Sequence, residues 1–157
     1  MPYDSLVMAA AATEINALTG ARVMKVYQPD RFGITLKLHA LEGNCQLLLS
    51  AHPVTGRAHL TTQARENPGN PPLFCMVLRK HLEGGRLIKV EQLGWERVLH
   101  LSFQITDETG MPGLRDLYLE IMGKHSNLVL VHPTDHLIID GIRRYSHNVS
   151  RHREVLP

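Results

Sequence analysis

The sequence predicts an α+β domain, an antiparallel or mixed β-sheet sandwich flanked by helices. Three observations lead to this fold class. Several short segments alternate apolar with polar residues, which is typical of strands with one buried face. Two other segments have the capping residues and the apolar spacing of helices. The turns between the strands are short and rich in glycine, asparagine and aspartate, which favours hairpins.

The first helix is expected over residues 4–19. Asp4 is a good N-cap, the alanines at 9–12 are strong helix formers, and Gly20 is a natural C-terminal stop. One side of this helix carries Val7, Met8, Ala11, Ile15 and Leu18. The opposite side has small residues, so a second element can approach it closely.

From Arg22 onward the apolar period changes to two, which predicts strands. Ile34, Leu36 and Leu38 alternate with polar residues, and an apolar run follows at 47–49. Turn-forming residues at 30–33 and 42–44 separate these segments. The pattern predicts an antiparallel meander.

A second helix is expected over residues 73–83, because a proline-rich loop precedes it and Gly84-Gly85 follows it. His81 falls on its apolar side and is interpreted as a hydrogen-bonded core histidine rather than a ligand. The outer side carries Met76, Arg79, Lys80 and Glu83. Further strands are expected at 86–93, 96–105, 115–122, 126–131 and 137–142.

Composition limits the possible classes of protein. A chain of 157 residues with 43% apolar content suits one compact domain. Its net charge is only +2, so a nucleic-acid site must rest on local clusters of basic residues. Cys45 and Cys75 lie in apolar patterns typical of buried thiols in a reducing compartment. Without a signal-peptide pattern or an apolar run of roughly 18 residues, we expect a cytoplasmic protein with no membrane association.

We find no catalytic or metal-binding signature. The serines, histidines and aspartates lack a supporting motif such as Gly-x-Ser-x-Gly. His132 and His136 are four residues apart, but Pro133 disfavours the helix that would bring both imidazoles to one side. We therefore predict no catalytic residues, no metal and no cofactor.

Two blocks of sequence indicate binding instead. Residues 71–86 and 120–127 each join an apolar element to Arg, Lys, His or Asn next to glycine, a composition suited to contacting phosphate or carboxylate. In the first block, Arg79 and Lys80 are additional candidates for RNA contact. Solvated surface positions, with Arg79 paired to Glu83, explain them equally well.

An acid-base pair, Glu96-Arg97, follows the only tryptophan, Trp95, at the start of a predicted strand. A single-stranded RNA contact, with arginine on phosphate and tryptophan stacked on a base, suits this arrangement. A strand-end ion pair beside a buried tryptophan is the alternative. The basic tail offers further candidates for RNA contact or for a solvated linker, namely Arg143, Arg144, Arg151 and Arg153.

Motifs spread over almost the whole chain match one family. Besides the blocks 71–86 and 120–127, the matching segments are Met1–Asp4, Tyr27–Pro29, Leu47–Pro53 and Ser150–Pro157. On these motifs the chain resembles the N-terminal domain of the NFACT family, known in bacteria as RqcH or as fibronectin-binding protein A (FbpA). The resemblance implies a fold like that of the N-terminal domain of formamidopyrimidine-DNA glycosylases. Because family members continue into further domains, residues 1–157 are expected to be one NFACT N-terminal domain of a longer multidomain protein.

The resemblance also implies a function and a site. The full protein would bind obstructed large ribosomal subunits carrying peptidyl-tRNA and recruit alanyl-tRNA, so that the ribosome adds a C-terminal alanine tail. This domain would be non-catalytic and would position tRNA, with the remaining domains as partners. Glu96-Arg97 matches an Asp-Arg pair of the family, with glutamate replacing aspartate. A second family segment matches Glu120, Ile121 and Met122, and Lys124 and Asn127 in the following turn add donors for phosphate and base edges.

Strand parity qualifies one of these residues. Ile121 shares parity with Leu117 and Leu119, so we expect it to pack in the core. Two other functions remain open. The older family name suggests a fibronectin-binding surface adhesin, and the glycosylase-like fold suggests an enzyme that uses the amine of Pro2. The second alternative lacks the acid that would assist the amine, because Tyr3 stands at that position.

Overall fold

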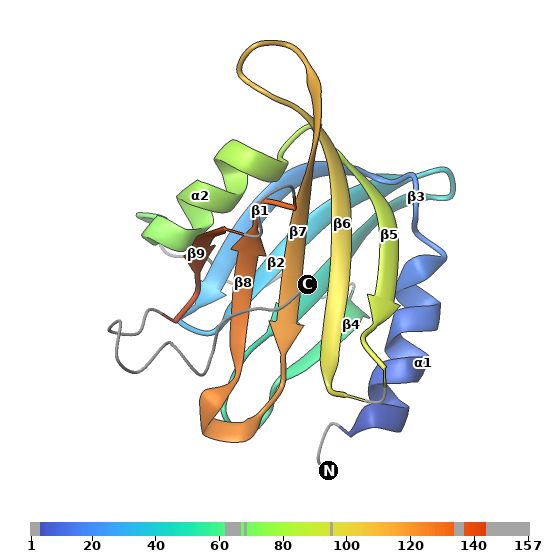
Figure 1. Ribbon diagram of the computed structural model, residues 1–157, viewed down its shortest axis with the longest axis vertical. Coiled ribbons are helices and arrows are strands. Elements are labelled where there is room, and N and C mark those ends of the chain that lie inside the picture. Colours follow the sequence, from blue (N-terminus) through green and yellow to red (C-terminus); the bar gives the residue numbers. More distant parts are fainter. Residues whose placement is uncertain (1–3, 62–66, 68, 95, 134–136, 144–157) are drawn as a thin grey trace.

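The computed structural model describes residues 4–61, 67, 69–94, 96–133 and 137–143 (Figure 1). In chain order the elements are α1 (Ser5–Asn16), β1 (Arg22–Asp30), β2 (Gly33–Ala40), β3 (Gly43–Ser50), β4 (Arg57–Thr61), α2 (Leu73–Leu82), β5 (Arg86–Gln92), β6 (Val98–Thr106), β7 (Pro112–Glu120), the one-turn helix η1 (Gly123–His125), β8 (Asn127–Val131) and β9 (Ile138–Gly141). The predicted α+β class is confirmed. The predicted strands are all present, with bounds that differ by a few residues.

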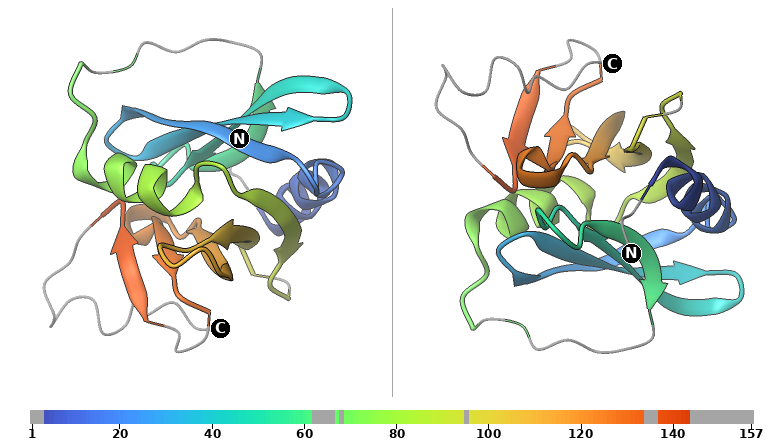
Figure 2. Two further views of the ribbon diagram at one scale, coloured as in Figure 1. Left: turned by 90° about the horizontal axis from the view of Figure 1, so that it is seen from above. Right: turned by 90° about the horizontal axis from the view of Figure 1, so that it is seen from below.

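All neighbouring strands pair antiparallel in one sheet, in the order β4-β3-β2-β1-β5-β6-β7-β8-β9. The sheet is continuous rather than divided into two separate sheets as a sandwich would be. Strands β1 and β5 join at the single pair Arg22–Arg86. Because so few bonds fix this junction, the sheet bends there, and its halves β1–β4 and β5–β9 face each other as two layers (Figure 2).

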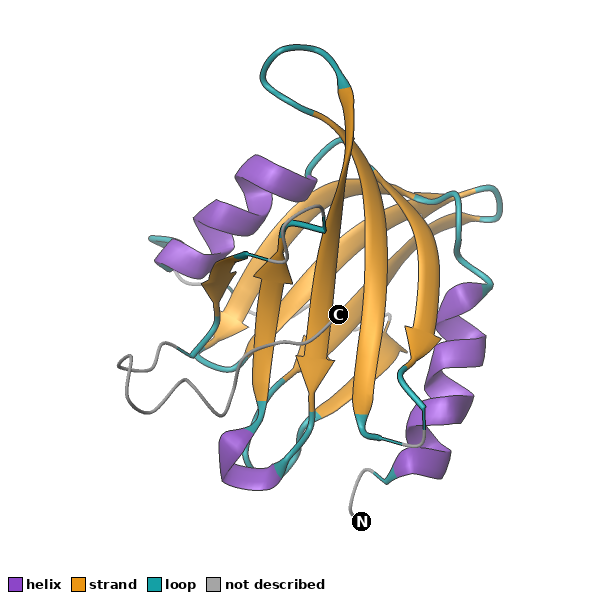
Figure 3. Cartoon of the chain, viewed as in Figure 1, coloured by secondary structure: helices purple, strands orange, loops and turns teal. Residues whose placement is uncertain are grey.

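The core fills the space between these two layers. Alternate residues of the strands point into it, as the period of two predicts. Helix α1 packs against β4, β5 and β6, and helix α2 packs against β1, β6 and β9. The helices therefore cover two opposite openings between the layers (Figures 2 and 3). The largest fully buried side chains include Ile34, Leu36, Leu38, Leu47, Leu49, Leu99 and Phe103.

Helix α1 begins as predicted, because the Asp4 carboxylate accepts a hydrogen bond from the Val7 amide at 2.9 Å. It ends at Asn16, three residues earlier than expected, and short-range turns lead to Gly20 at φ 95°. Met8 and Ile15 are buried. Val7, which we expected on the apolar side, is 37% exposed, because the helix turns that position towards solvent.

Helix α2 ends one residue earlier than predicted. Gly84 then adopts φ 87°, and Gly85 brings the chain against β6. A β-carbon at Gly85 would lie 2.8 Å from the Gln104 carbonyl oxygen, so this approach requires glycine. Cys75 is buried and burial raises the pKa of its thiol, in agreement with its predicted role as a small core residue. Neither described helix combines the length and apolar character needed to cross a bilayer.

Candidate nucleic-acid interface

The two candidate segments lie side by side at one end of the sheet. Val98, at the start of β6, pairs with Glu120, at the end of β7. One residue further, the Ile121 amide donates to the Arg97 carbonyl oxygen at 2.9 Å. Strand pairing therefore brings Glu96-Arg97 next to Glu120-Ile121-Met122, although the segments are separated by a long hairpin in the sequence.

A cavity of about 490 Å³ opens between these segments and the start of α1. Glu96 and Arg97 are exposed at this cavity, and Val98 and Met122 add apolar atoms to its lining. Asp4 and Ser5 complete the lining. The combination of a guanidinium, carboxylates and apolar atoms suits a ligand with both polar edges and a flat apolar surface.

A single side chain ties this arrangement together. The Gln92 amide nitrogen donates to the Glu96 carbonyl oxygen at 2.7 Å and to the Ser5 carbonyl oxygen at 3.1 Å. It thereby fixes the β5–β6 connection against the start of α1. Sequence reasoning assigned Asp4 only an N-cap role and missed Ser5 and Gln92, because nothing in their local pattern indicates that α1 begins beside the β5–β6 connection.

Ile121 packs in the core, as its parity predicts. It is 5% exposed and belongs to the main apolar cluster. Its side chain also restricts Gly56, where an added β-carbon would lie 3.4 Å from Ile121 Cγ2. Glu120 is 8% exposed and alternates with Ile121 along the strand, so the two side chains lie on opposite faces of the sheet.

The turn after β7 is held by Ser126. Its hydroxyl accepts from the Met122 amide at 2.8 Å and donates to the Gly123 carbonyl oxygen at 2.7 Å. Gly123 has φ 58°, which allows the chain to turn directly into η1. Lys124, on η1, is exposed at the lower end of the molecule in Figure 1.

Asn127 is buried, and its side chain binds the chain's own backbone. Its amide oxygen accepts from the Arg143 amide at 3.1 Å, and its amide nitrogen donates to the Arg143 carbonyl oxygen at 3.2 Å. The Arg143 guanidinium in turn donates to the Lys124 and Ser126 carbonyl oxygens. Asn127 therefore positions Arg143 beside η1, which its sequence pattern alone did not indicate.

Arg143 extends this end of the molecule towards the β1–β2 turn. Its guanidinium carbon lies 5.8 Å from the centroid of the Phe32 ring, and that of Arg31 lies 5.0 Å from the same ring. A cation above an aromatic face is attracted by the electrons of the ring. We call the surface formed by Glu96, Arg97, Met122, Lys124, Arg143, Arg31 and Phe32 the basic end.

Arg79 and Lys80 lie elsewhere, on α2. Arg79 donates to the Val26 carbonyl oxygen at 2.8 Å, and the expected pair with Glu83 is present at 3.9 Å. Glu83 also accepts from the Val26 amide at 3.0 Å, so this pair holds α2 against β1. Lys80 is exposed and forms an ion pair with Glu108 at 3.5 Å.

Other sequence predictions fall outside the described residues. These are Arg144, Arg151 and Arg153 of the tail, the stacking residue Trp95, the second histidine of the pair, His136, and the candidate nucleophile Pro2. Within the described part of the chain, no three His, Cys, Asp or Glu side chains gather in a way that could hold a metal ion.

A histidine network lies on the outer face of β5, β6 and β7, and the sequence did not predict it. His100 Nδ1 lies 3.0 Å from Glu91 Oε1, and its Nε2 lies 2.9 Å from Asp116 Oδ1. Burial opposes the imidazolium, but the hydrogen bonds to Asp116 and Glu91 prevail and raise the pKa of His100. The ring also stacks on Tyr118, with centroids 4.6 Å apart.

Ser102 completes the residue types of a hydrolytic triad, but the geometry is that of a structural network. Its hydroxyl donates to Asp116 at 2.7 Å. Both ring nitrogens of His100 face carboxylates, so the charged imidazole has no lone pair with which to activate the serine. This cluster is therefore not a nucleophilic site.

The fold and the basic end together define an α+β domain with an open, polar cavity at one end of a bent antiparallel sheet. The chain belongs to the NFACT family, because a family model described as NFACT N-terminal and middle domains matches residues 4–157.

Similar proteins come from bacteria and animals. Rqc2 homolog RqcH from Bacillus subtilis (strain 168) is 41% identical over 158 residues, which covers 100% of this chain and 28% of that protein. Ribosome quality control complex subunit NEMF from Mus musculus is 30% identical over 142 residues, covering 90% of this chain and 12% of that protein. The chain thus spans less than a third of the length of these relatives.

Solved structures share the fold. The N-terminal part of the fibronectin/fibrinogen-binding protein from Streptococcus suis superposes with a TM-score of 0.92 at 36% identity, covering 99% of this chain and 59% of that chain. The N-terminal domain of fibronectin-binding protein PavA from Streptococcus pneumoniae superposes with a TM-score of 0.89 at 35% identity, covering 94% and 57%.

Proposed function

We propose that this chain is the RNA-binding N-terminal domain of an RqcH-like ribosome quality control factor. In this proposal the protein acts in the cytoplasm on large ribosomal subunits obstructed by peptidyl-tRNA. It recruits alanyl-tRNA, and the ribosome adds alanine residues to the stalled chain. The domain is non-catalytic: it binds and orients tRNA, which lowers the entropic cost of placing the aminoacyl group.

The cavity at the basic end is the observation that carries this proposal. It joins both sequence segments that suggested RNA contact, and it places the Arg97 guanidinium beside apolar atoms of Met122. Arg97 contacts a phosphate or a base edge, and Glu96 accepts a hydrogen bond from an exocyclic amine. Glutamate retains the charge of the aspartate that the family has at this position and extends it by one methylene.

Lys124, Arg143 and Arg31 continue the positive surface away from the cavity. A folded RNA that inserts a base beside Met122 carries its backbone across this surface. The side chains of Glu120 and Asn127 are buried, and we assign them the support of neighbouring contact residues. Ile121 has the same supporting role through its packing in the core.

We also infer two features beyond the observed fold. The bent sheet with its covering helices is similar to the N-terminal domain of formamidopyrimidine-DNA glycosylases, without that enzyme's chemistry. Residues 1–157 form one NFACT N-terminal domain within a longer protein whose other domains share the contact with RNA. Shared contacts raise the effective concentration, so the single domain binds more weakly than the whole.

Equilibrium binding of tRNA to this chain at several salt concentrations tests the proposal. We expect Arg97→Ala to weaken binding and to reduce the salt dependence by about one phosphate contact. Arg22→Ala is the matched control, because Arg22 is exposed and pairs with Arg86 at the far end of β5, about 20 Å from the cavity. Equal effects of the two variants, or binding that salt does not change, would contradict the proposal.

One observation favours a second function. The titles of the similar solved structures name fibronectin or fibrinogen as ligands of those proteins. If this chain acts as an adhesin, it binds fibronectin saturably, and Arg97→Ala leaves that affinity unchanged while tRNA fails to compete. Surface plasmon resonance with both ligands distinguishes the two functions.

A further inference from the structure

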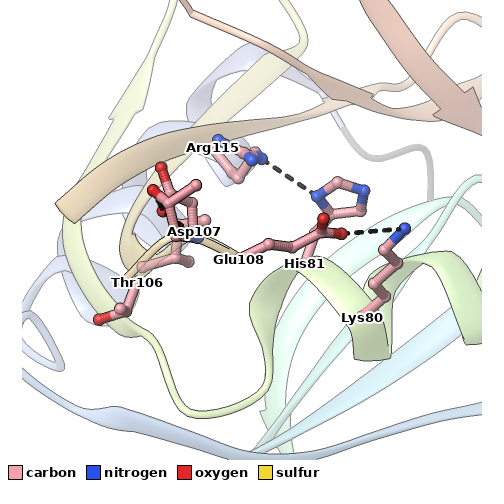
Figure 4. Close-up of a pocket in the computed structure, with 8 residues that line it drawn as sticks. Lys80, His81, Thr106, Asp107, Glu108 and Arg115 are labelled. Carbon is pink, nitrogen blue, oxygen red and sulfur yellow. Dashed lines mark hydrogen bonds and ion pairs between the residues drawn. The ribbon is translucent and has the colours of Figure 1, made fainter. Parts of the chain in front are cut away.

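A second cavity, of about 350 Å³, lies between α2 and the β6–β7 hairpin (Figure 4). Thr106, at the end of β6, lines this cavity, whereas Val98, at the start of β6, lines the cavity of the basic end. The nine residues of β6 thus separate the two sites by about 25 Å. The second cavity is independent of the proposed tRNA contact.

Three basic side chains line this second cavity. Lys80 and His81 come from the last turn of α2, and Arg115 comes from β7. Arg115 Nε donates to His81 Nδ1 at 3.1 Å, so the neutral imidazole carries its proton on Nε2 (Figure 4). The arrangement gathers an ammonium, a guanidinium and an imidazole N–H around one space. These are the donor types that proteins use for phosphate.

The electrostatic environment of His81 has the same sign. Burial lowers the pKa of His81, and the positive charges of Arg115 and Lys80, together with His132, lower it further. Among the causes of this shift only Glu108 acts in the opposite direction. A bound anion would relieve the repulsion among the cations and raise the pKa of His81.

Two carboxylates lie at the cavity, and they differ in availability. Asp107 is engaged by its own turn, where its Oδ1 accepts from the Thr109 amide and hydroxyl and from the Met111 amide. Glu108 instead reaches across to Lys80, and both side chains are largely exposed, at 85% and 67%. An exposed ion pair contributes little to stability, so an external anion can replace Glu108 at Lys80.

We propose that this cavity binds a phosphate group, with Lys80, His81 and Arg115 as donors and with Glu108 as the carboxylate that leaves Lys80 when phosphate arrives. The phosphate comes either from a free ion or from a phosphodiester of RNA. Both sources present the same anionic oxygens to the donors.

Two substitutions of the same ion pair give opposite predictions. Lys80→Gln removes a donor and should weaken phosphate binding about tenfold. Glu108→Gln removes the competing carboxylate and should strengthen binding several-fold. Because both variants break the same exposed ion pair, any effect on folding is the same in both, and only a phosphate site separates them.

The experiment follows the His81 imidazole resonances by NMR while inorganic phosphate is added to the whole chain at millimolar concentration. Sulfate serves as a second probe, because it keeps its charge over the pH range in which histidine titrates. We expect both anions to shift the resonances and to raise the pKa of His81. Unshifted resonances, or equal anion affinities for Lys80→Gln and Glu108→Gln, would overturn the proposal.

A second arm distinguishes the sources of phosphate. If the site takes a phosphodiester, Lys80→Gln also lowers affinity for a single-stranded RNA and reduces its salt dependence by about one contact. If it takes a free ion, RNA affinity is unchanged and the anion titration alone responds. Arg97→Ala leaves the anion titration unaltered in either case, so failure of the tRNA proposal is distinguishable from failure of this one.

Discussion

Ile121 allows packing and RNA contact to be separated within one segment of the candidate interface. The structure places this side chain in the core at 5% exposure, directly between the exposed Met122 and the buried Glu120 in sequence. If packing is its role, Ile121→Ala must lower the free energy of unfolding. The affinity of the folded molecules for RNA must change little.

The magnitude follows from the atoms removed. Ile121→Ala deletes three carbon atoms, which at about 0.8 kcal/mol each corresponds to about 2.4 kcal/mol of lost burial. The cavity left beside Gly56 adds to this, because the loop there is already in close contact and cannot collapse fully. We expect a total of about 3 kcal/mol, within the usual range for such a change. Ile121→Val should cost about 1 kcal/mol.

Urea denaturation measures the stabilities, and tRNA titration at a temperature where the variant is folded measures the affinity. The expected result is a large loss of stability with less than a twofold change in affinity, corrected for the folded fraction. The reasoning is refuted if Ile121→Ala loses less than about 1 kcal/mol or if affinity falls without a change in stability. Either outcome would make Ile121 a contact residue.

Two further predictions concern the other networks. Because the folded-state pKa of His100 is raised above 6.5, its contribution to stability is complete below that pH and is lost as the pH rises through the folded value. Urea denaturation as a function of pH should show this loss, and His100→Gln should remove it. Asn127→Ala leaves the Arg143 backbone without its partners and should cost about 1–3 kcal/mol. Hydrogen exchange of the Arg143 amide should accelerate, and an unchanged rate would refute the bracket that we describe.

Local patterns in the sequence predicted the elements well. The Asp4 cap, the Gly84-Gly85 stop and the alternation of Leu99, Leu101 and Phe103 each depend on neighbours in the sequence, and each is confirmed. The bend of the sheet was not predictable in this way. It depends on the single pair Arg22–Arg86, which joins residues far apart in the chain.

The candidate site shows the same limit. Parity identified Ile121 as a core residue, because parity is a local property. The partners of Asn127 and Arg79 are long-range, so their types suggested phosphate donors where the structure shows bonds to the backbone. The His100 network needs the register of three strands at once, and no sequence signal reports that register.

Amide hydrogen exchange with and without bound tRNA tests the central claim most directly, because it maps the contact without any substitution. The account predicts slower exchange on binding at the start of α1, in the β5–β6 connection around Arg97, and from Met122 through η1. The far end of β5 at Arg86 should be unaffected. Protection confined to other surfaces, or none at Arg97 and Met122, would contradict the account.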